Sequence, residues 1–159
     1  FTGKTVTGIA GKKNFTVIFI EKSLMNAEIG FTHKVLSVLL KHHISFEHMP
    51  SGIDTMSFVI DSEELKNGVL EEICEDIRQA VSPNNLRVHD DIALIAVVGH
   101  GMSRNVGTSA RLFNAIARAG INVRMIDQGS SELNIIVGVD NENYENTLKA
   151  VYEEFFNET

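Results

Sequence analysis

A glycine-bearing loop at residues 97–107, VVGHGMSRNVG, has the composition of a phosphate-binding loop. It follows an apolar run, IALIAVV, and precedes a segment of helical character, TSARLFNAIARAG. Gly99, Gly101 and Gly107 therefore lie where a strand-loop-helix unit places the glycines that approach a phosphate. The chemistry suggested by this spacing is binding of a nucleotide or another phosphorylated ligand.

An internal repeat argues against that chemistry. Residues 15–61 align with residues 92–138 without a gap, and the alignment pairs Gly30 with Gly107. In the first copy the loop reads IEKSLMNAEIG, which lacks the two earlier glycines. The second copy has no Gly-Lys-Ser/Thr ending that would bring a cation to a phosphate. We therefore do not expect a nucleotide site at this loop.

Each copy has the pattern strand, helix, strand, strand, helix. FTVIFI is an apolar run of strand length, and TMSFVID and HHISFEHM flank the turn PSGID. The first helix is predicted from Val35, Leu36, Leu39 and Leu40. The second helix is predicted from Leu65, Val69, Leu70, Ile73 and Ile77 in one copy and from Leu148, Val151, Tyr152 and Phe155 in the other. The first copy continues into NNLRVHD, a fourth strand that completes a βαββαβ unit.

The second copy has no segment left for a fourth strand, since the chain ends at Thr159. The strand-like segment TVTGIAG, residues 5–11, has no role in the first copy and can fill that place. The prediction is an α+β fold of two ferredoxin-like βαββαβ modules. One module spans residues 14–90, and it is inserted into a discontinuous second module of residues 4–11 plus 91–159.

Composition restricts the partners. With 14 basic and 21 acidic residues the net charge is -7, which opposes nucleic acid or an anionic membrane as a partner. The apolar runs are too short to span a bilayer and no charged-then-apolar leader is present, so a cytoplasmic protein is expected. Cys74 is the single cysteine and is expected to pack in a helix. The chain begins with Phe1, which suggests an excised fragment.

Catalytic and metal-binding patterns are weak. The six histidines show no paired ligand spacing, so no metal site is expected, and no serine or cysteine nucleophile has a base at recognisable spacing. An RNA-binding version of the fold would expose aromatic and basic residues, whereas this chain has no Trp and two Tyr. The fold alone decides little about function.

The tandem modules, the discontinuous first strand, and the strings MPSGIDTMSFVI and INVRMIDQGSSELNIIV resemble the paired ACT domains of the regulatory half of aspartokinases. The resemblance implies a parent enzyme that phosphorylates aspartate with ATP and Mg, at the start of lysine, threonine and methionine synthesis. Its kinase half is absent here, so the fragment is expected to be non-catalytic and to need no cofactor. The resemblance also implies a homodimer formed through ACT modules, contact with the kinase domain of the same chain, and an amino-acid effector.

The residues themselves can form an amino-acid site. The loop SLMNAEIGFT, residues 23–32, brings Gly30, Phe31 and Thr32 to a helix start, where free N–H groups and the positive end of the helix dipole attract a carboxylate. Carboxylates in ISFEHMPSGID and in the loop itself could hold an α-ammonium and a second cation. These candidates are Glu28, Glu47 and Asp54, with Ser45 beside them.

In lysine-sensitive aspartokinases the ligand lies between the first ACT modules of two subunits. The positions that match are Met25, Glu28, Gly30, Phe31, Thr32, Ser45, Phe46, Glu47, Ser51, Gly52 and Ile53. Ile53 stands where those enzymes have an acidic residue, so Asp54 or Glu28 would have to replace it. A different interpretation makes the acidic residues solvated surface, Gly52 and Gly129 turn glycines with positive φ, and Met25 a core plug.

In the second module, DQGSSE at residues 127–132 matches a family segment that contributes to module pairing and, in threonine-responsive relatives, to a ligand site. The candidate residues are Met102, Gly107, Asn122, Gln128, Gly129, Ser130, Ser131 and Glu132. A structural role is favoured, because Arg104 and Asn105 lack an acidic partner for an amine. Three alternatives stay open: a threonine or combined lysine and threonine sensor, a dimerisation module without ligand, and a small enzyme acting on a phosphorylated substrate at residues 99–107.

Overall fold

The computed structural model describes residues 5–101, 105–129 and 134–157. Contacts divide the chain into two compact units, one formed by Asn14–Asp90 and one by Phe1–Lys13 with Asp91–Thr159. Asn14 (φ 71°) and Asp91 (φ 57°) lie at the two boundaries and have a left-handed backbone, which Asn and Asp adopt more readily than most residues. The first unit is thus inserted into the second along the chain.

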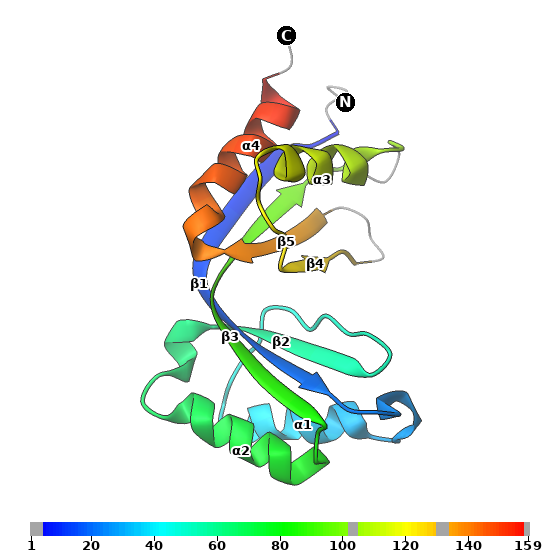
Figure 1. Cartoon of the computed structure of the whole chain (residues 1–159), viewed down its shortest axis with the longest axis vertical. Coiled ribbons are helices and arrows are strands. Elements are labelled where there is room, and N and C mark those ends of the chain that lie inside the picture. The colour runs from blue at the N-terminus through cyan, green and yellow to red at the C-terminus, as the bar shows by residue number, and fades with distance from the viewer. Residues whose placement is uncertain (1–4, 102–104, 130–133, 158–159) are drawn as a thin grey trace. The chain divides into compact units, whose positions relative to one another are not determined.

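Two long strands contribute to both units, and hydrogen bonding gives the strand order β2-β1-β3-β5-β4. The elements are β1 (Gly8–Glu21), η1 (Met25–Ala27), α1 (Phe31–Lys41), β2 (Thr55–Asp61), η2 (Ser62–Leu65), α2 (Val69–Val81), β3 (Asn85–Val98), α3 (Thr108–Arg118), β4 (Met125–Asp127), β5 (Asn134–Asp140), η4 (Asn141–Asn143) and α4 (Tyr144–Phe156). Figure 1 shows their course.

In the unit of residues 14–90, α1 and α2 cover one face of the sheet (Figure 1). β1 pairs with β2 in antiparallel register from Phe15 opposite Asp61 to Glu21 opposite Thr55. Every second residue points to the same face of a strand, so Ile18 packs with its β2 neighbours against the helices. The remaining strand residues in this core are Ile20, Met56, Phe58 and Ile60.

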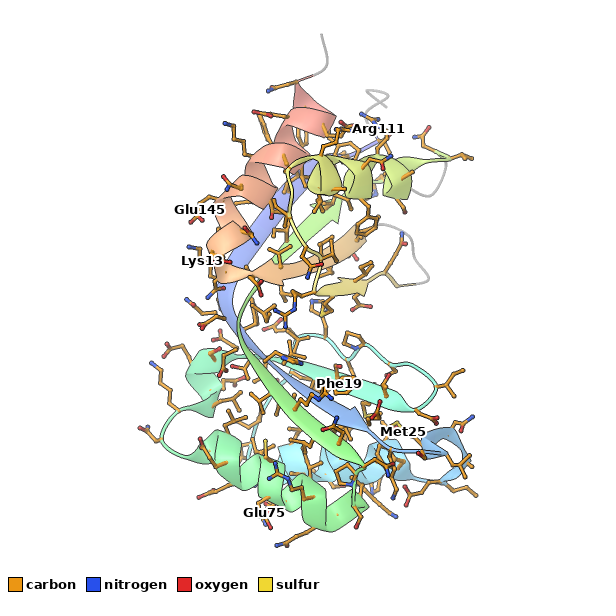
Figure 2. The ribbon with its side chains drawn as sticks, in the orientation of Figure 1. Lys13, Phe19, Met25, Glu75, Arg111 and Glu145 are labelled. Atoms are coloured by element: carbon orange, nitrogen blue, oxygen red, sulfur yellow. The ribbon has the colours of Figure 1, made fainter. Side chains whose placement is uncertain are left out.

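In the other unit, β3 pairs with β5 from Ile92 opposite Asp140 to Val98 opposite Asn134. The N-terminal segment lies beside β3, where the Thr7 N–H donates to the Val98 carbonyl oxygen at 2.8 Å. Val6 is buried in the same core as α3 and α4. Lys13 pairs with Glu145 of α4 at 2.9 Å (Figure 2). The N-terminal segment therefore supplies the fourth strand of this unit, and the predicted pair of ferredoxin-like βαββαβ modules is confirmed.

Two local expectations need correction. The predicted strand HHISFEHM, residues 42–49, is not continuous, and the chain before β2 pairs with that strand through isolated bridges of His48 to Val59 and Ser51 to Met56. Pro50 has no N–H to donate, which limits pairing at this edge. Leu65 lies in η2 and not in α2, because Gly68 with φ 83° separates the two helices.

Two residues that fit the apolar spacing of a helix are exposed in the structure, one on α1 and one on α4. Leu40 of α1 is exposed. Tyr152 is 54% exposed and stacks on Phe156 with ring centroids 5.1 Å apart. Both residues satisfy helical spacing but lie at the margin of the apolar face, where spacing alone does not distinguish buried from exposed positions.

The glycines of the 97–107 loop have structural roles. A Cβ on Gly99 would overlap the carbonyl oxygen of Thr5, so this glycine allows the N-terminal strand to pass close to the backbone of the loop. The Asn105 side chain then donates to the Thr5 hydroxyl at 3.1 Å and to the Gly101 carbonyl at 2.9 Å. Gly107, with φ 94°, is the N-cap of α3.

Within the described residues, none of the helices is both long and apolar enough to cross a membrane.

Candidate ligand site at the start of α1

The first turn of α1 has two backbone donors without an acceptor in the described part of the chain. Gly30 is the N-cap with φ 81°, and its carbonyl accepts the first helical bond from the Lys34 N–H at 3.0 Å. Among the described residues, the N–H groups of Thr32 and His33 have no hydrogen-bond acceptor. These two donors lie at the positive end of the helix dipole, and such a position favours a carboxylate or another anion.

A cavity of about 300 Å³ opens beside these donors. This volume is at the lower end of the range for small-molecule sites, roughly 300–1,000 Å³. The walls come from the loop that contains η1, from the first turn of α1 and from the turn before β2; Figure 2 shows Met25 in η1. Eight predicted residues line the cavity: Met25, Glu28, Gly30, Phe31, Thr32, Ser51, Gly52 and Ile53.

Four predicted residues do not line the cavity. Ser45 is exposed, and the Phe46 ring packs edge-on against Phe58 with centroids 5.3 Å apart. Glu47 is exposed, and its side chain has no partner among the described residues, although its N–H donates to the Val59 carbonyl. Asp54 has one buried carboxylate oxygen, Oδ1, without a partner among the described residues.

Sequence reasoning missed five lining residues, Asn26, His33, Met49, Thr55 and Met56. His33 follows Thr32 in the first helical turn, so the rule that the first four N–H groups are free already pointed to it. Met49, Thr55 and Met56 belong to the hairpin, where the bridge of Ser51 to Met56 fixes the register. That register was not predictable from the irregular segment around Pro50.

Glu28 is already paired with two cations. Lys22 Nζ lies 3.3 Å from its Oε2, and Lys34 Nζ lies 3.4 Å from its Oε1. Desolvation favours the neutral acid, but the hydrogen bonds and charges of Lys22 and Lys34 outweigh it and hold the pKa of the Glu28 carboxyl below its ordinary value. Glu28 is therefore less available to a ligand ammonium than the sequence suggested.

The backbone at Gly52 and Gly129 and the burial of Met25 bear on the different interpretation of these residues. Gly52 and Gly129 do not have positive φ, so the interpretation of both as left-handed turn glycines is wrong. At Gly52 an added Cβ would come 2.5 Å from the Thr55 hydroxyl oxygen, so close contact in the turn explains this glycine. Met25 is buried in the core and lines the cavity as well, so the two interpretations of this residue are compatible.

The described candidate residues of the second module do not line the cavity that the first-module residues share. Gly107 caps α3, and Asn122, Gln128 and Gly129 are exposed. Met102, Ser130, Ser131 and Glu132 lie outside the described residues. No group of three or more His, Cys, Asp or Glu residues within ranges 5–101, 105–129 and 134–157 could hold a metal ion.

Comparison with known proteins identifies the family. The ACT domain family model matches residues 95–155. Aspartokinase 3 of Bacillus subtilis is 38% identical over 155 residues, which cover 98% of this chain and 34% of that protein. The structure of Clostridium acetobutylicum aspartate kinase is 48% identical with a TM-score of 0.91, over 95% of this chain and 35% of that one. This chain belongs to the ACT-domain regions of bacterial aspartokinases.

Other relatives show which part of an aspartokinase this ACT region matches. The regulatory subunit of aspartate kinase from Thermus flavus is 25% identical with a TM-score of 0.80, over 96% of this chain and 99% of that one. By contrast, the chain spans about a third or less of the length of the curated aspartokinases it matches. The ACT region thus matches a regulatory subunit over its full length and the longer enzymes over one part.

Proposed function

We propose that this ACT region is the amino-acid sensor of an aspartate kinase, and that its first module binds an end-product amino acid, lysine, for feedback inhibition. The observation that carries the proposal is the cavity at the start of α1, which places the unpaired amides of Thr32 and His33 beside an amino-acid-sized space. The amides hold the α-carboxylate, and the methylene groups of the side chain pack against Met25 and Phe31.

The ammonium groups need a carboxylate. Glu28 is engaged by Lys22 and Lys34, and Ile53 offers no charge. Glu47 is exposed and its carboxylate has no partner among the described residues, so it remains the best acceptor for a ligand cation, from the same chain or from a second copy. Asp54 is the second candidate, because its Oδ1 is buried without a partner in the described part of the chain.

A second copy of the chain is expected to cover the site. Leu24, Ile29 and Ile53 lie in the two segments that wall the cavity and are 73%, 98% and 77% exposed. Exposed aliphatic side chains grouped at a site favour a protein interface.

Light scattering of the unmutated chain should report a homodimer. Ile29→Glu should shift the equilibrium toward monomer, whereas Val106→Glu, at the equivalent place in the second module, should not. A clean monomer of the unmutated chain at tens of micromolar, with and without lysine, would contradict this arrangement.

In the parent protein, the kinase half would bind ATP and Mg and phosphorylate aspartate, and this region would be non-catalytic. The effector would inhibit by binding one arrangement of the dimer more tightly than the arrangement that permits catalysis. Couplings of this kind amount to roughly 1–3 kcal/mol. Threonine at the second module, acting with lysine, is a variant of the same function.

A melting curve with a panel of amino acids tests the proposal. A ligand at ten times its Kd should add about 1.4 kcal/mol to the free energy of unfolding, and lysine should give the largest rise in Tm. An unchanged Tm across all common amino acids, in a dimeric sample, would favour a dimerisation module without ligand. The remaining alternative is a small enzyme that acts on a phosphorylated substrate at residues 99–107. Calorimetric titration with ATP and NAD tests it, since tight binding of either would favour such an enzyme.

A further inference from the structure

Lys22 follows the last residue of β1, and its ammonium group contacts several segments around the cavity. Its Nζ lies 2.5 Å from the carbonyl oxygen of Val81, the last residue of α2, and 3.3 Å from Glu28 Oε2. The same Nζ lies 5.8 Å from the centroid of the Phe31 ring, within cation–π range. A carbonyl at a helix C-terminus is at the negative end of the dipole, so it favours this cation.

The backbone of Lys22 contacts the remaining wall of the cavity. Its N–H donates to the Asp54 carbonyl at 3.0 Å, which joins the end of β1 to the turn before β2. Next to it, the Ser23 N–H donates to the Asn84 side-chain oxygen at 2.6 Å. The start of the loop is thus fixed to the hairpin and to the connection between α2 and β3.

Glu28 connects Lys22 to the start of α1. Its N–H donates to the Met25 carbonyl, and its own carbonyl accepts from the Phe31 N–H. Its two carboxylate oxygens are held by different lysines, and the Lys22 side chain is the more sheltered, with 25% exposure against 47% for Lys34. A sheltered ion pair is screened less by solvent and salt, so Lys22 contributes more than Lys34 to the position of Glu28.

We propose that Lys22 is a positioning residue of the effector cavity: by holding the Glu28 carboxylate and the Val81 carbonyl together, it fixes the loop 23–30 and the first turn of α1 in the shape that receives the ligand. Glu28 then forms part of the cavity wall and is not the acceptor of the ligand ammonium. This inference rests on the proposed function for the identity of the ligand but not for the geometry.

The first test needs no ligand and uses amide hydrogen exchange of this chain. Lys22→Met should raise exchange at residues 23–32 by at least ~10-fold and leave the strands of the same unit protected. Lys41→Met is the matched control, because Lys41 at the end of α1 pairs with Asp76 of α2 at 3.1 Å and does not line the cavity. Unchanged exchange at residues 23–32 in Lys22→Met would overturn the proposal.

The second test is calorimetric titration with lysine. Lys22→Met should weaken binding by at least ~10-fold at a nearly unchanged Tm, and Lys22→Arg should restore it to within ~3-fold, because a guanidinium still bridges the two oxygens. Lys22→Gln keeps a donor for Val81 but removes the charge, and it serves if Lys22→Met fails to fold. Equal affinity in the wild type and in Lys22→Met or Lys22→Gln would overturn the proposal.

A double-mutant cycle separates positioning from general destabilisation. If Lys22 acts through Glu28, then Lys22→Met combined with Glu28→Gln should lose less affinity than the product of the two separate losses. A multiplicative loss would contradict the proposal. A wild-type chain that binds no amino acid would refute the proposed function, and the exchange experiment would still decide the role of Lys22.

Discussion

Gly30 and Gly107 have the same backbone conformation at the N-caps of α1 and α3, with φ of 81° and 94°. At neither position would an added Cβ meet another atom within 4 Å. The cost of a side chain there comes from backbone strain and not from a clash. The repeat thus reproduces a structural feature in both modules, whereas the cavity that we assign to the effector lies at the first of them.

Alanine at either glycine should cost about 1–2 kcal/mol of unfolding free energy, because an L-residue with a left-handed backbone is strained by this amount. Only Gly30→Ala should also weaken lysine binding, since its methyl group lies beside the cavity. Denaturant unfolding gives the stability and calorimetry gives the affinity. If Gly107→Ala weakened binding as much as Gly30→Ala, the assignment to the first module would be wrong.

Glu47→Gln keeps the size of the side chain and removes its charge. Glu47 is exposed in the single chain, and the proposed second copy would desolvate its pair with the ligand ammonium. Removing one member of such a pair costs roughly 2 to 5 kcal/mol, so lysine affinity should fall at least ~30-fold while Tm without ligand stays the same. Glu64→Gln, on the exposed η2 turn, is the matched control and should bind normally. Wild-type affinity in Glu47→Gln would direct attention to Asp54.

The fold was predictable because the sequence contains two copies of one module, residues 15–61 and 92–138. Gly30 aligned with Gly107, and the segment around Val6 was the only strand without a place, so the discontinuous second module followed from the sequence alone. The segment 42–49 was misjudged as a continuous strand, because its ladder with β2 is reduced to isolated bridges beside Pro50, which has no N–H to donate. Leu40 and Tyr152 were misjudged because the edge of an apolar face depends on tertiary packing.

Asp76 should give the ACT region a measurable acid sensitivity. Hydrogen bonds from His42 at 2.7 Å and from Lys41 at 3.1 Å hold the pKa of its carboxyl below the ordinary value. A group whose pKa is lowered in the folded state stabilises the fold above its unfolded pKa, about 3.9, and loses that contribution as the pH falls through the folded pKa.

Asp76→Asn should therefore be less stable than the wild type at neutral pH, and the difference should shrink below about pH 3.9. Glu75→Gln is the control, since Glu75 is the adjacent carboxylate on α2 and is largely exposed (Figure 2). Melting temperatures from pH 7 to pH 3 provide the comparison. A pH-independent gap between wild type and Asp76→Asn would show that the stabilisation does not depend on ionisation.

Gly99 should be required for the attachment of the N-terminal strand. In Gly99→Ala the new methyl group would overlap the Thr5 carbonyl, and a strained insertion of this kind costs about 1–3 kcal/mol. Gly8→Ala is the control, because nothing lies within 4 Å of a Cβ at that position. Hydrogen exchange in Gly99→Ala should rise at residues 5–10 and in the part of β3 beside them.

Deletion of residues 1–13 should have a stronger effect on the same unit, because it removes Val6 from the core and the strand beside β3. Exchange that rose only around residues 15–25 after this deletion would contradict the assignment of the N-terminal strand to the second module.

The candidate site was predictable only where it depends on local sequence, and not where it depends on how distant segments fold together. The helix start at Gly30 has a sequence signature, so Phe31 and Thr32 were found. The pairing of Glu28 with Lys22 was not predictable, because it depends on how the loop folds back toward Val81. The register of the hairpin decides which of its residues face the cavity, and a proline-interrupted segment does not reveal that register.

Backbone amide NMR of the ¹⁵N-labelled chain during a lysine titration is the direct test of effector binding at the start of α1, since it observes the Thr32 and His33 donors themselves. We expect saturable shifts of the Thr32 and His33 amides, with smaller changes at the equivalent start of α3 and, in Gly30→Ala, saturation only at higher lysine concentration. An effector site at the start of α1 would be ruled out if lysine and threonine left both amides unmoved at saturating concentration, or if the largest shifts appeared at residues 108–110 instead.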